Sequence, residues 1–142
     1  MRHYTRLSVS RSMNLLDIEQ MIHTTACAIY KRRSLNQRTF LACFGVTTCV
    51  LAKCWRLINE AALVRRQVFS CRDLLWTAMF LKQYSSEDVL SATCGVSQKT
   101  FRLQVRKVMN AMNSRYSNVV SSHFSSFINL CFLNFSKNTN YI

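Results

Sequence analysis

The scarcity of glycine and proline constrains this chain more than any other feature. Its 142 residues contain no proline and only two glycines. Strands joined by tight turns usually need more of both, because glycine supplies positive φ and proline presets the first corner of many turns. The sequence therefore predicts an all-α protein, a small helical domain of about five or six helices.

Apolar residues spaced three and four apart indicate where the helices lie. The first is expected from about Met13 to Arg33, with Lys31, Arg32 and Arg33 at its end complementing the helix dipole. The fourth is expected over 71–84, capped by Ser70. The remaining helices are expected over about 38–43, from a cap at Thr47 or Thr48, from a cap at Ser85 or Ser86 to Gly95, and over 98–112.

Composition divides the chain into three parts. Residues 1–37 form a basic N-terminal segment with one amphipathic helix, and residues 38–112 form a helical domain. Residues 113–142 are rich in Ser, Asn and Phe and show no helical period. We expect this tail to be poorly ordered.

The charge is strongly basic and unevenly distributed. Lys and Arg total 19 against 6 Asp and Glu, a formal net charge of +13. All acidic residues lie at or before Asp88, so every charge after that position is positive. Such an excess is typical of proteins that bind nucleic acid, although a basic surface without a specific role is the plainer interpretation.

No pattern in the sequence indicates an enzyme, a metal site or a cofactor. The seven cysteines contain no Cys-x-x-Cys pair, the three histidines are scattered, and no glycine-rich phosphate loop occurs. We expect no small-molecule substrate and a reduced, nuclear or otherwise intracellular location. The apolar run 127–135 is too short for a transmembrane segment. The basic, Ser-bearing N-terminus leaves a mitochondrial presequence as a less favoured alternative.

The stretch CGVSQKTFRLQVRKVMNAM, from Cys94 to Met112, predicts a helix-turn-helix. Gly95 would end one helix at positive φ, Val96 would fill the angle between the helices, and Ser97 would cap the next helix. The second helix would bury one apolar stripe, formed by Phe101, Val105, Val108 and Met112.

The opposite face of that helix carries the candidate DNA-binding residues, Gln98, Lys99, Arg102, Arg106 and Lys107. Gln pairs with adenine edges, Arg binds guanine through two hydrogen bonds, and Lys neutralises phosphate. The alternative is an ordinary solvated basic face. Gly45, Val46 and Thr47 repeat the turn pattern fifty residues earlier. That copy is interpreted either as a structural partner or as a degenerate second helix-turn-helix.

Residues 74–103, LLWTAMFLKQYSSEDVLSATCGVSQKTFRL, resemble the region ahead of the catalytic domain in Harbinger-like transposases of the DDE superfamily. A Leu-Leu-Trp helix, a Phe-Leu-Lys-x-Tyr segment and a Gly-Val-Ser-x-Lys-Thr-Phe-Arg turn recur there. The looser likeness spans 40–112, about half the chain, and departs at Gln104, where the family often has Trp. The resemblance implies a DNA-binding helix-turn-helix.

The family's enzyme holds two divalent metals with three carboxylates, and no acidic residue follows Asp88 here. We therefore expect a truncated, transposon-derived chain without catalytic activity. Two other functions stay open. One is a protein-interaction module that uses helical surfaces, with Trp55, Trp76 and Phe80 as anchors. The other is a mitochondrial or membrane-surface protein.

Overall fold

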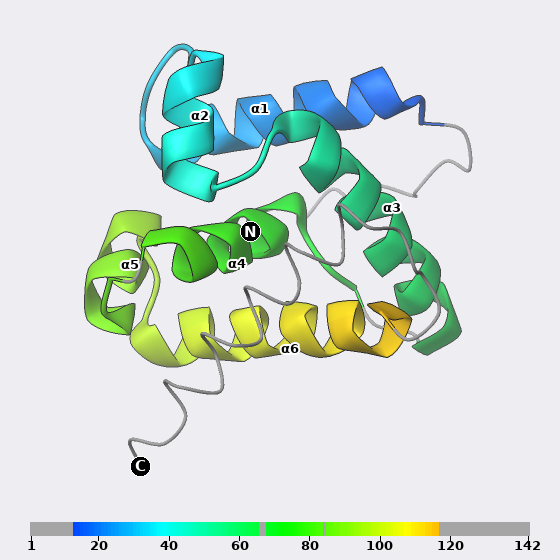
Figure 1. Ribbon diagram of the computed structural model, residues 1–142. Helices are drawn as coiled ribbons and strands as arrows, with labels where there is room; N and C mark the ends of the chain where they lie inside the picture. The colour runs from blue at the N-terminus through cyan, green and yellow to red at the C-terminus, as the bar shows by residue number, and fades with distance from the viewer. Residues whose placement is uncertain (1–12, 66–67, 84, 117–142) are drawn as a thin grey trace, which may run out of the picture.

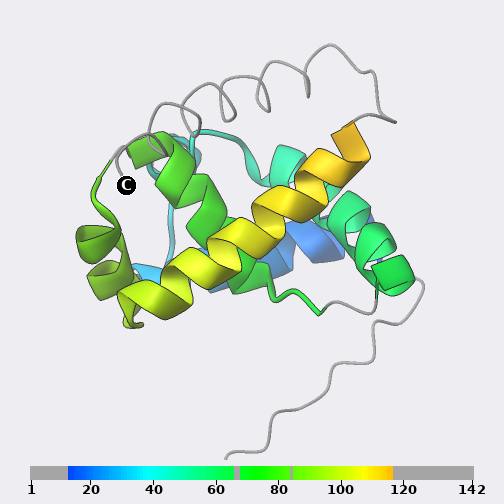
Figure 2. The ribbon, with the colours of Figure 1, turned by 90° about the horizontal axis from the view of Figure 1, so that it is seen from below.

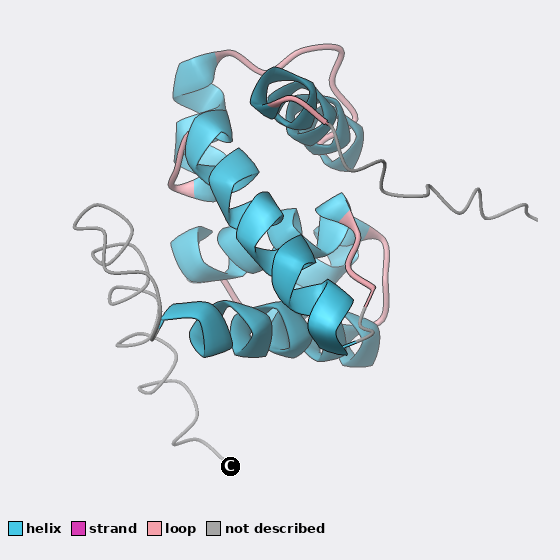
Figure 3. Ribbon diagram, turned by 90° about the vertical axis from the view of Figure 1, so that its right-hand side faces the viewer, coloured by secondary structure: helices cyan, strands magenta, loops and turns pink. Residues whose placement is uncertain are grey.

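The computed structural model describes residues 13–65, 68–83 and 85–116, and every element in these ranges is an α-helix (Figures 1 and 3). The predicted all-α fold is confirmed. The tail falls outside the described residues from residue 117 onward. The helices are α1 (Leu15–Ile29), α2 (Gln37–Phe44), α3 (Thr48–Arg65), α4 (Cys71–Gln83), α5 (Glu87–Cys94) and α6 (Gln98–Tyr116).

Helix α4 is the centre of the molecule. It packs against the other five helices, and Figure 1 shows it between α1 and α2 above and α6 below. The side chains predicted to face the core are all buried, and Trp76 and Thr77 are buried as well. A helix covered on nearly every side holds its neighbours in fixed positions. The predicted inner residues are Leu74, Leu75, Ala78, Met79 and Leu81.

Helix α1 joins the same core but ends earlier than the sequence predicts. Its buried residues include Ile18, Ile22 and Ala26, which lie where α1 meets α3 and α4. The helix stops at Ile29 because the backbone turns to a φ of 53° at Lys31. Lys31 and its two neighbours therefore follow the last turn of α1 instead of lying in it.

Side-chain caps fix the helix starts. Ser70 and Asp73 bond reciprocally, Ser70 N donating to Asp73 Oδ2 at 2.8 Å and Asp73 N donating to Ser70 Oγ at 3.3 Å. Of the alternatives left open, Thr47 accepts from Val50 N and Ser86 accepts from Val89 N. Each cap satisfies a backbone donor that the first turn leaves unpaired.

No single helix in the described ranges is long and apolar enough to cross a membrane. One pair, Gln37–Phe44 with Thr48–Asn59, meets the length and composition requirement jointly and is bent by 50°. Within that pair Phe44, Leu51 and Ile58 are buried in the core.

Candidate nucleic-acid interface

Helix α5 ends at Gly95 as the sequence predicts. Gly95 has a φ of 70°, Gly95 N donates to Ala92 O at 3.1 Å, and Val96 N donates to Ser91 O at 3.0 Å. These two bonds form the common helix stop in which a left-handed glycine satisfies the last carbonyls.

A turn of three residues then leads into α6. Val96 is half-buried against the core, and Leu90 of α5 is fully buried. Ser97 Oγ accepts from Thr100 N at 3.2 Å and caps α6. Helix α5 packs against both α6 and α4, so the turn is fixed at both ends.

Gly95→Val is expected to lower the free energy of unfolding by roughly 1–3 kcal/mol, because a β-branched residue is strained at positive φ. A Cβ at Gly95 would meet no atom within 4 Å, so the cost comes from the backbone alone. Urea unfolding measures the effect. Gly95→Asn is the control and should cost less, because Asn tolerates this conformation. Equal stability of Gly95→Val and the unchanged protein would contradict the assigned turn.

One face of α6 is buried, as the sequence predicts. Phe101 lies with its ring centroid 5.9 Å from that of Trp76 and 6.4 Å from that of Phe80, which attaches the start of α6 to α4. The helix continues to Tyr116, four residues beyond the predicted end at Met112, because no helix-breaking residue follows. The buried residues of α6 are Phe101, Val105, Val108, Met109, Ala111 and Met112.

The opposite face of α6 is open to solvent. All five candidate residues are exposed: Gln98, Lys99, Arg102, Arg106 and Lys107. Seen from below in Figure 2, α6 is the helix nearest the viewer. Three of the four cations form no ion pair with any described residue. The structure therefore presents these side chains on one accessible surface.

Arg102 differs from the other cations because Glu87 of α5 binds it. Arg102 Nε donates to Glu87 Oε2 at 2.7 Å, and the Nη2–Oε2 distance is 2.5 Å. This hydrogen bond, together with the negative charge of Glu87, raises the pKa of Arg102. The two residues are fifteen positions apart, so only the geometry of the turn brings them together. An external anion therefore competes with Glu87 for Arg102.

The earlier copy of the turn pattern has a different arrangement. Gly45 has a φ of 75° and Thr47 caps α3, so the turn itself is similar. However, α2 packs against α4 rather than folding back on α3. Ala52, which aligns with Arg102, is fully buried. These facts favour the interpretation of the earlier copy as a structural partner.

The aromatic residues considered as partner anchors are less accessible than that hypothesis requires. Trp76 is only 3% exposed, and the Arg72 guanidinium lies 5.5 Å from the centre of its ring. Trp55 and Phe80 are half-buried against the core. Trp76 is therefore a core residue, and its proposed role as a surface anchor is wrong.

No protein-family model, curated protein or solved structure matches this chain. Among the described residues, no group of three or more His, Cys, Asp or Glu side chains is placed to hold a metal ion.

Proposed function

We propose that this chain is a non-catalytic DNA-binding module in which α5, the turn and α6 form a helix-turn-helix. The exposed basic face of α6 is the observation that carries the proposal. Its buried opposite face attaches the helix to α4, so the cations lie on a rigid support. A rigid, positively charged helix suits the major groove, which is wide enough to admit one.

Each exposed residue takes a role that follows from its position on α6. Gln98 and Lys99 lie at the helix start, where recognition helices usually contact base edges. Arg102 and Arg106 are one turn apart and bind guanine or phosphate, while Lys107 binds phosphate near the edge of the face. No catalytic role is assigned, because the chain has no acidic residue after Asp88.

A transposon origin is part of the same proposal. It is supported by the resemblance of residues 74–103 to Harbinger-like transposases, since that stretch covers most of α4, all of α5 and the turn, and the start of α6. A DNA partner favours a nuclear or otherwise intracellular location.

Glu87→Gln is expected to strengthen DNA binding about fivefold at low salt, because it releases Arg102 and removes an opposing charge. The slope of log K against log salt should stay nearly unchanged, because Arg102 makes the same phosphate contact in both proteins once it has left Glu87. Fluorescence anisotropy with a labelled duplex over a salt series measures both quantities.

Asp88→Asn is the matched control. Asp88 is exposed in the same first turn, and its loss changes the net charge equally, but it forms no ion pair with a described residue. It should strengthen binding by less than twofold. If both variants strengthen binding equally, the change in net charge explains the effect. If Glu87→Gln binds DNA more weakly than the unchanged protein, Glu87 positions Arg102 for DNA.

A further inference from the structure

A second group of unpaired cations lies where α1 leads into α2. Lys31, Arg32, Arg33 and Arg38 are all exposed, and none forms an ion pair with a described residue. The sequence contains no acidic residue from position 20 to position 59. We call these four residues the α1–α2 basic surface. No described carboxylate pairs with these cations, so the surface attracts anions.

The loop that carries three of these cations is held to the helices by hydrogen bonds and one buried side chain. Arg32 N donates to Cys27 O at 3.0 Å, which closes the end of α1. The buried side chain of Leu35 anchors the middle of the loop, and His23 Nε2 lies 2.9 Å from Leu35 O. Asn36 Oδ1 accepts from Thr39 N and starts α2. The backbone that carries these cations is therefore fixed, and a fixed backbone loses less conformational entropy when it binds a ligand.

Lys31 occupies a backbone conformation that glycine adopts without steric cost. Its φ of 53° makes it the only non-glycine residue with positive φ in the described ranges. The chain thus has a cation at a position where local geometry favours glycine. Residues in such conformations gather at functional sites more often than elsewhere.

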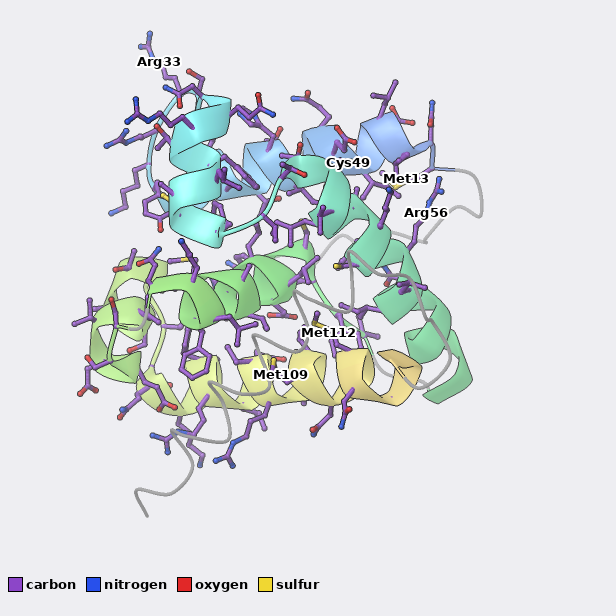
Figure 4. The ribbon with its side chains drawn as sticks, viewed as in Figure 1. Met13, Arg33, Cys49, Arg56, Met109 and Met112 are labelled. Atoms are coloured by element: carbon purple, nitrogen blue, oxygen red, sulfur yellow. The ribbon has the colours of Figure 1, made fainter. Side chains whose placement is uncertain are left out.

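The α1–α2 basic surface faces away from the basic face of α6. Figure 1 shows α1 and α2 above α4 and α6 below it, and in Figure 4 Arg33 projects from the upper edge. The buried stripe of α6 packs toward α4 and α3, so the cations of α6 point downward. A straight duplex lying along one surface does not reach the other.

We propose that the α1–α2 basic surface binds the phosphate backbone of a second DNA duplex, so that one molecule bridges two duplexes. The inference rests on the proposed function, which supplies the first duplex at α6. Residues 31–38 present no large exposed apolar side chain, and Leu41 is the only one on α2. Protein interfaces usually include an apolar centre, whereas phosphate contacts need only cations, and this difference favours DNA over a protein partner.

The test is the capture of a fluorescent duplex by an immobilised unlabelled duplex. The full chain should capture the fluorescent duplex. The captured amount should be greatest at intermediate protein concentration. It should fall at high concentration, because each duplex then binds its own protein molecules and no single molecule bridges the two. Arg32→Gln with Arg33→Gln should reduce capture at least fivefold. The same variant should bind a single duplex through α6 with a dissociation constant within twofold of the unchanged protein.

Lys53→Gln with Arg56→Gln is the matched control, because it removes two exposed charges from α3. Arg56 projects from α3, away from Arg33 (Figure 4). This control should retain capture. Equal loss in the control and the test variant would overturn the inference, as would full capture by the test variant, which would indicate bridging through a dimer.

The two proposals fail in different ways. If the unchanged protein binds one duplex but captures no second, only the bridging inference is wrong. If it binds no duplex at all, the proposed function is wrong as well.

Discussion

Arg102→Ala combined with Arg106→Ala is expected to weaken DNA binding while leaving helix content unchanged, because neither side chain contributes to the buried stripe. With Lys99 and Lys107 they make four cations, and four phosphate contacts give log K against log salt a slope of about −3.6. The unchanged protein should then lose about 150-fold in affinity between 50 and 200 mM salt. The variant's slope should flatten by about 1.8, which reduces that loss to about 12-fold.

Base reading by one arginine would give a different result. If Arg102 or Arg106 pairs with guanine, its loss should relax preference at one base pair by roughly 5- to 150-fold, with a smaller change in slope. Binding to a panel of duplexes that differ at single positions separates this case from simple phosphate contact.

The control for this pair is the neutralisation of Lys31, Arg32 and Arg33. It removes three charges instead of two, yet should cost less affinity for a single duplex, because these residues lie across the molecule from α6. If the triple weakens binding as much as the pair does, general basicity explains the charge. Absence of binding at near-physiological salt would also contradict the recognition role of α6.

The second half of the fold was predictable because its signals are local and agree with one another. Gly95, Ser97 and the spacing of apolar residues in α6 each indicate the same break and the same buried face. The cap at Ser70 and the apolar face of α4 are equally local. Agreement between turn, cap and periodicity leaves few alternative structures for such a segment.

Other features depend on contacts that the sequence pattern does not contain. Apolar spacing continues to Ile29, and the basic residues beyond it suit a helix end, so nothing local indicates the left-handed turn at Lys31. The turn at Gly45 resembles that at Gly95, yet α2 packs on α4 because α1 and α6 already cover α3. Tertiary packing decides both outcomes.

The sequence predicts which side chains form the candidate site and that they are exposed. It does not predict whether each of them is free to bind an external anion. Its five side chains are exposed as expected, which follows from the helical period alone. The pairing of Arg102 with Glu87 depends on how α5 meets α6. A helical wheel treats the four cations as equal, whereas the structure makes one of them compete with an internal anion.

Phe101→Ala is expected to lower the free energy of unfolding by about 3–5 kcal/mol, the usual cost of removing a fully buried phenylalanine. Phe101 is the fourth residue of α6 and packs against Trp76 and Phe80 of α4, so its loss leaves a cavity at the joint between the two helices. Single domains have about 5–15 kcal/mol of stability, so this variant should be near its unfolding midpoint at modest temperature. Urea unfolding followed by circular dichroism measures the change.

Leu103→Ala is the control on the same helix, because Leu103 is 50% exposed and two residues away. It should change stability by less than about 0.5 kcal/mol, as substitutions outside the core usually do. Phe101→Leu retains most of the buried volume and should fall between the two. Equal stability of Phe101→Ala and Leu103→Ala would mean that the start of α6 is not attached to α4. The basic face would then lack the rigid support on which the DNA-binding proposal depends.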